Sequence, residues 1–233
     1  MNIGLFGYGK MGKKIEQIAQ DRGHTITAKI NDSSQEVDYS AFDVAIDFSA
    51  PEAAFKNITR CFEHKVPVIS GTTGWLEKYE DAIEICNANQ SAFIYASNFS
   101  LGVNIFFELN KKLAQMMAGL DQYRVSMEEI HHTQKLDAPS GTAITLAEGI
   151  ISNSTYNKWK LNESGDHIVP IKSIREGMVP GTHTISYGSA VDTIQIKHEA
   201  HNREGFALGA VIASEWIQGK EGVFTMKDVL NLS

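Results

Sequence analysis

The N-terminal segment constrains the fold more than any other part of this sequence. An apolar run at residues 2–6 predicts a strand, which leads directly into a glycine loop at residues 7–12. Apolar residues then recur at helical spacing until Gly23 ends the pattern; they are Met11, Ile15, Ile18 and Ala19. The order strand, GxGxxG, helix is typical of dinucleotide-binding folds, because the glycines allow a tight turn, close approach of the backbone to a pyrophosphate and close helix packing. This context favours dinucleotide binding over a purely structural glycine turn.

The second predicted strand, at residues 25–30, ends in Asn31 and Asp32, where such folds contact the adenosine ribose. An aspartate there accepts hydrogen bonds from the ribose hydroxyls and repels a 2′-phosphate, which favours NADH. Lys10 or Lys29 could offset the repulsion, so the use of both NADH and NADPH stays open. An aspartate in a loop is also a common turn residue.

Strands predicted at residues 44–48, 66–69 and 93–95 alternate with helical patterns, which indicates an α/β domain with a Rossmann-like, doubly wound parallel sheet. Ligands of such sheets bind beyond the carboxyl ends of the strands. The turns GTTG (71–74) and ASNF (96–99) follow two of these strands and are expected to flank a nicotinamide. On local pattern alone, GTTG is equally a permissive turn and Phe99 equally a core residue.

Residues 128–142, EEIHHTQKLDAPSGT, carry the densest set of chemically active side chains. Two imidazoles, an ammonium and a carboxylate stand beside a Ser-Gly-Thr turn at which a helix is predicted to begin. A helix N-terminus binds anions, and histidine titrates near neutral pH. The segment therefore predicts an active site. Each part has a simpler interpretation: a structural or metal-binding His131-His132 pair, a solvated Lys135, and Ser140 as a helix cap. A zinc site at the histidine pair is disfavoured, because adjacent strand residues point to opposite faces and no cysteine lies nearby.

The second half of the chain has a different pattern of predicted secondary structure from the first. After a helical pattern at residues 101–116, longer strands are predicted at residues 168–175, 182–187 and 193–198, which indicates an α+β domain. The segment 152–165 is polar and turn-rich and is expected to be a surface excursion. A small-residue helix and the C-terminal segment are expected to return to the first domain. The boundaries would then be 1–99 with 204–233 for the dinucleotide-binding domain and 100–203 for the second, with hinges near Phe99 and Arg203.

Composition limits the classes of function. The 233 residues are 42% hydrophobic and 21% charged, as in an ordinary globular protein, and the net charge of −7 argues against general affinity for nucleic acid or anionic membranes. No apolar run is long enough to span a bilayer, and no leader pattern precedes the first strand, so a cytoplasmic location is expected. Cys61 and Cys86 lack CxxC spacing and are expected to be reduced, buried thiols.

Seven segments together carry a resemblance to a known family. They are the glycine loop, DFSAPEA (47–53), GTTG (71–74), ASNFSLGVN (96–104), EIHHTQKLDAPSGTA (129–143), SIREGMVPGTHT (173–184) and the terminal GKEGVFTMKDVL. In this order, and over essentially the whole chain, they resemble the 4-hydroxy-tetrahydrodipicolinate reductase (DapB) family of bacterial lysine biosynthesis. The pattern HHxxKxDAPSGTA is highly specific to that family.

The resemblance implies a homotetrameric, NADH- or NADPH-dependent oxidoreductase, without a metal, whose C-terminal domain binds substrate and forms the tetramer contacts. It implies reduction of a cyclic dicarboxylate, 4-hydroxy-tetrahydrodipicolinate, to tetrahydrodipicolinate with loss of water. By position, the family's proton donor or acceptor is His131 and its proton donor is Lys135. Its substrate-binding residues are His132, Lys135, Ser140, Gly141 and Thr142. Its cofactor contacts are Gly7, Tyr8, Gly9, Lys10, Met11, Gly12, Asn31, Asp32, Gly71, Thr73, Ala96 and Phe99.

This sequence departs from the family pattern in three places. The glycine loop is shorter by a residue than in many members, and Ile130 stands where a small residue often precedes the histidine pair. Enterobacterial-type members often have an acidic residue followed by arginine where this chain has Asn31-Asp32, which bears on NADPH use. Two other interpretations stay open: a non-catalytic NAD(P)-sensing module, and a different small-dicarboxylate or amino-acid dehydrogenase.

Overall fold

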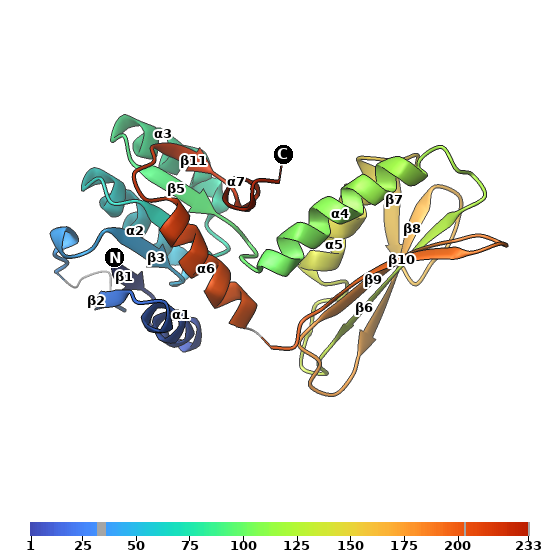
Figure 1. Ribbon diagram of the computed structural model, residues 1–233, viewed down its shortest axis with the longest axis horizontal. Helices are drawn as coiled ribbons and strands as arrows, with labels where there is room; N and C mark the ends of the chain where they lie inside the picture. The colour runs from blue at the N-terminus through green and yellow to red at the C-terminus, as the bar shows by residue number, and fades with distance from the viewer. Residues whose placement is uncertain (32–35, 203, 233) are drawn as a thin grey trace. The chain divides into compact units, whose positions relative to one another are not determined.

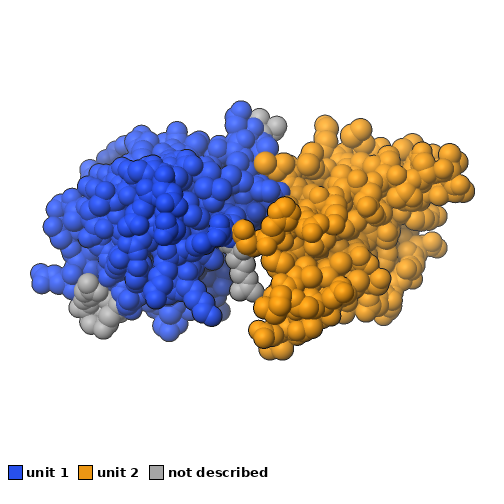
Figure 2. All heavy atoms as spheres, turned by 60° about the horizontal axis from the view of Figure 1, so that its bottom comes forward, with its two compact units in different colours: residues 1–104, 204–233 blue, residues 105–203 orange. Residues whose placement is uncertain are grey.

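The computed structural model describes residues 1–31, 36–202 and 204–232, and it divides into two compact units (Figure 2). Unit 1 comprises residues 1–104 and 204–233, and unit 2 comprises residues 105–203. The first division falls inside helix α4 (Leu101–Met117) rather than at Phe99. The reason is packing: Leu101 contacts the core of unit 1, whereas Phe106 belongs to the core of unit 2. Asp32 lies outside the described residues.

Unit 1 contains a six-stranded, fully parallel sheet in the order β11-β5-β4-β3-β1-β2 (Figure 1). The chain runs outward from β1 to β2, then returns to β3 on the other side of β1 and continues outward. This reversal confirms the Rossmann-like, doubly wound sheet and places a ligand-binding crevice at the carboxyl ends of β1 and β3. The strands are β1 (Asn2–Phe6), β2 (Thr25–Ile30), β3 (Val44–Asp47), β4 (Val68–Ser70), β5 (Ala92–Tyr95) and β11 (Gly222–Phe224).

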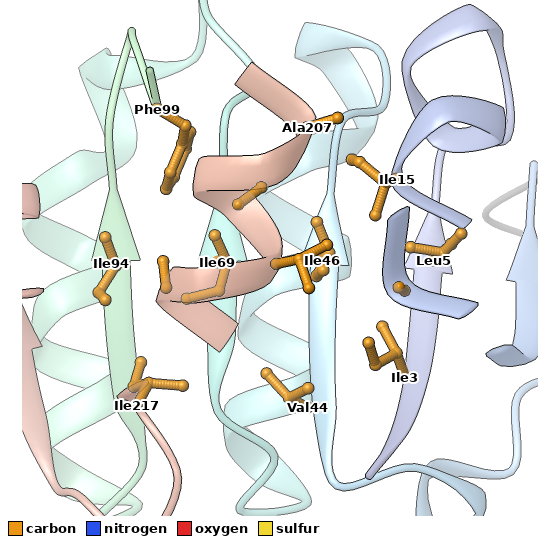
Figure 3. Close-up of a cluster of buried hydrophobic side chains, with 14 of the residues drawn as sticks. Ile3, Leu5, Ile15, Val44, Ile46, Ile69, Ile94, Phe99, Ala207 and Ile217 are labelled. Atoms are coloured by element: carbon orange, nitrogen blue, oxygen red, sulfur yellow. The ribbon is translucent and has the colours of Figure 1, made fainter. Parts of the chain in front are cut away.

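Helices cover both faces of this sheet. On one face, α1 (Lys10–Asp21) and α6 (Glu204–Trp216) pack against strand residues such as Leu5, Ile46 and Ile69 (Figure 3). On the other, α2 (Pro51–Glu63) and α3 (Tyr79–Ala88) bury a second cluster. Burial on both faces explains why the inner strands β1, β3, β4 and β5 have continuous apolar runs rather than alternating patterns. Two 3-10 turns, η1 (Tyr39–Ala41) and η2 (Leu76–Lys78), and the short α7 (Met226–Leu230) complete the unit.

Small residues let α6 approach the sheet closely, as the sequence predicts. A methyl group on Gly209 would overlap the carbonyl oxygen of Phe99, and Ala207, Ala210 and Ala213 are fully buried beside it. Cys61 and Cys86 lie in the opposite cluster as free, buried thiols. Burial raises the pKa of the Cys86 thiol to about 11, which keeps it protonated.

Unit 2 contains a mixed five-stranded sheet in the order β10-β9-β6-β8-β7. Strands β6, β7 and β8 run parallel, whereas β9 is antiparallel to both β6 and β10. Helices α4 and α5 (Gly141–Ile151) pack on one face and share a core with the inward residues of the central strands. This arrangement confirms the α+β architecture. The strands are β6 (Arg124–His131), β7 (Lys158–Leu161), β8 (Ile168–Arg175), β9 (Thr182–Gly188) and β10 (Thr193–Glu199).

Strand β7 corrects the expectation that residues 152–165 are only a surface excursion. The segment pairs in parallel with β8, and Trp159 packs against the core of unit 2. It lies at the edge of the sheet, where Lys158 is exposed and the other three residues are half-buried. None of the helices in the described parts of the chain is long and apolar enough to cross a membrane.

Candidate active site

The three glycines of the N-terminal loop have different structural environments. Gly7 has φ +90°, and a methyl group there would overlap the carbonyl oxygen of Phe48 on the neighbouring connection. A methyl group on Gly12 would overlap the carbonyl oxygen of Gly7. At Gly9, by contrast, nothing lies within 4 Å of an added Cβ. Gly9 is also the N-cap of α1, and no side chain caps the first amides of that helix. This arrangement fits the pyrophosphate of a dinucleotide.

Asn31 holds the glycine loop in place, because its Oδ1 accepts a hydrogen bond of 2.7 Å from the backbone N–H of Tyr8. The phenol of Tyr8 donates to Glu16, and the Lys29 ammonium lies 2.7 Å from Glu16 and 3.1 Å from the phenol oxygen. Hydrogen bonds from Lys29 and Tyr8 lower the pKa of the Glu16 carboxyl. Lys29 is therefore already paired with a carboxylate at the end of β2. Lys10 and Met11 form the first turn of α1.

A buried carboxylate organises the GTTG turn. Asp47, at the carboxyl end of β3, accepts hydrogen bonds from the hydroxyls of Ser49 (2.6 Å), Ser70 (3.0 Å) and Thr72 (2.7 Å). Burial raises the pKa of Asp47, and these hydrogen bonds oppose that rise. The Thr72 hydroxyl also accepts from the backbone N–H of Ser49 at 2.9 Å, which joins the two loops. Asp47 was missed as a site residue, although hydroxyl residues after two neighbouring strands were a usable signal.

The other predicted cofactor contacts lie at the same edge of the sheet. Gly71 packs against the ring of Phe48, where a side chain would overlap the ring, and Thr73 beside it is exposed. Ala96 is half-buried after β5, and its N–H donates to the carbonyl of Ser70 at 3.1 Å. The side chain of Phe99 is 1% exposed and belongs to the core of unit 1. Its contribution to a ligand site is therefore limited to its backbone.

In unit 2, strand register gathers ionisable side chains at one end of β6. Glu129 and His131 alternate in phase with Met127 and so share the face that α4 and α5 cover. The antiparallel neighbour β9 places His183 directly opposite Glu129. The parallel neighbour β8 places Arg175 beside His131.

These four side chains form a connected network. The buried carboxylate of Glu129 pairs with Nδ1 of His131 and with the Arg175 guanidinium at 2.9 Å. The rings of His131 and His183 meet edge to face, with centroids 5.1 Å apart. Burial opposes the charge of Glu129, but hydrogen bonds from His131 and Arg175 outweigh it and hold the pKa at about 2. Glu129 is therefore ionised at neutral pH.

The network reaches the start of α5 through Ser140. Its hydroxyl lies 3.1 Å from Nε2 of His183 and accepts from the backbone N–H of Ala143 at 3.2 Å. Ser140 is thus the N-cap of α5, and its side chain is 3% exposed. A helix cap is the simpler interpretation that the sequence allowed for this residue. Gly141 is exposed and Thr142 half-buried in the first turn, where the amides are free to bind an anion.

Arg175 also fixes the loop that carries Lys135. Its guanidinium donates to the backbone carbonyls of Asp137 (2.6 Å) and Lys135 (3.3 Å). The Lys135 ammonium lies 2.8 Å from the Asp137 carboxylate, and the side chain is 22% exposed. His132 follows β6 directly and is half-buried. One guanidinium therefore connects the strand that carries His131 to the loop that carries Lys135.

Three members of this network, Glu129, Arg175 and His183, were not identified from the sequence. The i, i+2 spacing of Glu129 and His131 on a predicted strand was the one local signal, because such residues share a face. Glu129, His131 and His183 also lie close enough together to hold a metal ion, with ligand atoms within 4.8 Å of one another. The pairing of Glu129 with Arg175 places a positive charge at the same carboxylate, so the cluster is satisfied as an ion pair.

The burial of His183 leads to a testable pH dependence. Burial lowers its pKa to about 3, whereas the unfolded chain has about 6.5. The folded state therefore binds fewer protons than the unfolded state over this range, so the free energy of unfolding falls as the pH drops below about 6.5. In the wild type, His183 is expected to lower the free energy of unfolding by on the order of 1 kcal/mol for each pH unit between about pH 6.5 and pH 5. In His183→Gln this contribution to the pH dependence should be absent. Urea unfolding at several pH values, monitored through the amide signals of β6 and β9, measures the free energy of unfolding of both proteins. The same pH slope in both proteins would contradict this account.

Two family models match the sequence of this chain. The model "Dihydrodipicolinate reductase, N-terminus" matches residues 1–99, and "Dihydrodipicolinate reductase, C-terminus" matches residues 102–230. This chain belongs to the dihydrodipicolinate reductase family. The membership confirms the resemblance seen in the sequence, and with it the expectation of an NADH- or NADPH-dependent oxidoreductase of lysine biosynthesis.

Curated relatives span the whole chain. The 4-hydroxy-tetrahydrodipicolinate reductase of Christiangramia forsetii is 59% identical over 234 residues, which cover 99% of this chain and 98% of that one. The protein of the same name from Rickettsia rickettsii is 37% identical, with 100% of both chains covered.

Solved structures agree on the fold. Dipicolinate-bound dihydrodipicolinate reductase from Paenisporosarcina sp. TG-14 matches with a TM-score of 0.78 and 22% identity over 97% of each chain. An aspartate dehydrogenase from Thermotoga maritima has a TM-score of 0.51 and 14% identity, over 96% of this chain and 99% of that one. Both likenesses concern the fold alone.

Proposed function

We propose that this chain reduces 4-hydroxy-tetrahydrodipicolinate to tetrahydrodipicolinate with NADH or NADPH, releasing one water per turnover. The observation that carries the proposal is the 59% identity, over 99% of this chain, to a curated protein named for that reaction. The residues agree with it, because unit 1 has an open glycine loop and unit 2 gathers imidazoles and an ammonium beside a helix N-terminus.

The cofactor would lie at the carboxyl edge of the unit 1 sheet. The loop at residues 7–12 would hold the pyrophosphate through free amides, and the turns that contain Gly71, Thr73 and Ala96 would line the nicotinamide side. When bound, the nicotinamide supplies the hydride. Asp47 keeps the GTTG turn in a fixed position, so that its backbone does not have to be ordered when the cofactor binds.

The substrate would lie at the start of α5. It has two carboxylates, and the amides of Gly141 and Thr142 with the Thr142 hydroxyl form a suitable anion site. Lys135 and His132 would supply positive or hydrogen-bonding partners for the same groups. The Ser140 hydroxyl already has two partners, so we assign Ser140 an indirect role: it fixes the first turn of α5 and the ring of His183.

A proton must reach the substrate after it has been reduced. Loss of the 4-hydroxyl group as water first gives a conjugated carbon–carbon/carbon–nitrogen system. Hydride addition to this system leaves an electron-rich enamine, and its carbon takes a proton from the Lys135 ammonium or from the protonated ring of His131. General acid catalysis of this kind contributes roughly 10²–10⁴-fold in rate. The buried partners of His131, Glu129 and Arg175, keep its ring in one orientation for that step.

The same proposal includes a homotetramer built through unit 2, a cytoplasmic location, and the absence of nucleic-acid or membrane partners. Family membership and the net charge of −7 support these points. Sedimentation at micromolar concentration tests the assembly, and a monomer that turns over substrate at full rate would contradict it.

Turnover tests the reaction itself. Substrate is made fresh from pyruvate and aspartate semialdehyde by a condensing synthase, and the absorbance of NADH or NADPH is followed. Rapid, protein-dependent oxidation is the expected result. A folded protein that binds both cofactors but oxidises neither would contradict the reductase proposal and favour a sensing module.

The pairing of Lys29 with Glu16 leads to a prediction about cofactor preference. Because Glu16 neutralises Lys29 at the end of β2, the ammonium is not available to a 2′-phosphate. Glu16→Gln is expected to raise the ratio of kcat/KM for NADPH to that for NADH by about 3- to 10-fold, because it leaves the Lys29 ammonium without its carboxylate partner. Glu84→Gln, on the exposed side of α3, is the matched control. An unchanged ratio would remove Lys29 from the ribose region.

A further inference from the structure

We propose that Glu129 is a positioning residue that holds His131 in the Nδ1–H tautomer, so that Nε2 is the atom that takes up a proton from water and then passes it to the substrate. The inference rests on the proposed function only for the use made of that proton. The tautomer itself is a property of the folded protein and is measured without substrate.

The chemistry of the carboxylate dictates the tautomer. The Glu129 side chain is 0% exposed, and an ionised carboxylate can only accept hydrogen bonds. Its Oε2 faces Nδ1 of His131, so that nitrogen must carry the proton. A neutral imidazole has one N–H, which leaves Nε2 with its lone pair. The same bond fixes the plane of the ring.

Arg175 fixes the carboxylate in turn. Its guanidinium donates to Oε1 of Glu129 at 2.9 Å, while Oε2 is left to His131. The same nitrogen, Nη2, also donates to the backbone carbonyl of Asp137, and Nε donates to that of Lys135. Because guanidinium has donors only, it cannot exchange roles with His131. The orientation of His131 is therefore coupled to the Lys135 loop.

Gly181 lies on the opposite side of the ring. A Cβ added to Gly181, in the connection before β9, would lie 3.0 Å from Nε2 of His131. His183 packs edge to face on the same ring, and burial keeps it uncharged at neutral pH, since its pKa is about 3. His131 is thus surrounded on the Nδ1 side by a fixed acceptor and on the Nε2 side by a residue without a side chain.

A simpler role for Glu129 is to join β6 and β8 through its ion pair with Arg175. The two roles differ in what Glu129→Gln should do. Arg175 requires an acceptor, so the glutamine oxygen would turn to it and the amide NH₂ would face Nδ1 of His131. Nδ1 would then have to accept, which forces the proton to Nε2. A purely structural ion pair predicts lower stability but no change of tautomer.

Long-range ¹H–¹⁵N spectra of the full-length protein with ¹⁵N-labelled histidine, at about pH 8, read the tautomer directly. The His131 signals are assigned by their loss in His131→Asn. We expect Nδ1–H in the wild type and Nε2–H in Glu129→Gln, together with a fall in kcat of at least roughly 10²-fold and an unchanged Kd for NADH. Glu128→Gln is the matched control, because Glu128 is the next residue of β6, points to the other face and pairs with Lys172 at 2.9 Å.

Two results would overturn the inference: Nε2–H in the wild type, or retention of Nδ1–H in folded Glu129→Gln whatever its turnover. If that variant does not fold, the wild-type spectrum alone decides. If the tautomers are as expected but the wild type does not reduce the substrate, the positioning role stands and the proposed function fails.

Discussion

Replacing Lys135 by alanine is expected to lower kcat by roughly 10²–10⁴-fold while leaving the Kd for NADH nearly unchanged. Lys135 is partly buried, is held by Asp137 and by the contact of Arg175 with its carbonyl, and belongs to unit 2. The glycine loop belongs to unit 1 and does not depend on it. The KM for substrate is expected to rise as well, because a countercharge to a carboxylate is lost. His131→Ala is expected to show the same separation of turnover from nucleotide binding.

Lys172→Ala is the control for the loss of a lysine from unit 2. Lys172 pairs with Glu128 on an exposed part of β8, and its side chain is 64% exposed. Lys172→Ala is expected to keep kcat within about 2-fold of the wild-type value, because an exposed ion pair contributes little. Parallel loss of NADH binding in Lys135→Ala and His131→Ala would mean that these residues are misassigned, as would unchanged turnover.

Alanine at Gly7 and at Gly9 is expected to affect different properties, although the two residues stand in one loop. At Gly7, φ is +90° and the methyl group would overlap the Phe48 carbonyl, so the free energy of unfolding of unit 1 should fall by roughly 2–5 kcal/mol. At Gly9 nothing lies within 4 Å, so stability should change by less than about 1 kcal/mol. The added methyl group would instead occupy the space predicted for the pyrophosphate, and NADH affinity should fall at least roughly 10-fold.

Urea unfolding and NADH titration of the two variants measure this difference. The pair serves as its own control, because the chemical change is identical. An unstable Gly9→Ala, or a Gly9→Ala that binds NADH as the wild type does, would contradict the assignment of the pyrophosphate to this loop.

Local sequence signals predicted the elements that depend on neighbouring residues. The strand, glycine loop and helix at the N-terminus follow from steric limits at Gly7 and Gly12, which act within a few residues. The start of α5 follows from the capping preference of Ser140. The apolar patterns predicted both sheets. Strands buried on two faces have continuous apolar runs, and strands buried on one face alternate between apolar and polar residues.

Features that depend on pairing of distant strands could not be read in this way. His183 meets Glu129 only because β9 pairs antiparallel with β6 in one register, and Arg175 meets it only through the parallel pairing of β8. A one-residue slip would turn each side chain to the other face. The edge strand β7 was missed because its polar composition resembles that of a loop. The division between the two compact units falls inside α4 rather than at Phe99, because Leu101 packs against the core of unit 1. That contact joins residues distant in sequence and has no local signal.

The fate of the transferred hydride tests the central claim most directly. NADH with deuterium at both C4 positions of the nicotinamide is mixed with the protein and freshly condensed substrate, and the product is examined by mass spectrometry. The account predicts tetrahydrodipicolinate that carries one deuterium, formed in proportion to the NADH consumed. Oxidation of NADH without deuterium in the product, or no product from a folded protein that binds NADH, would contradict it.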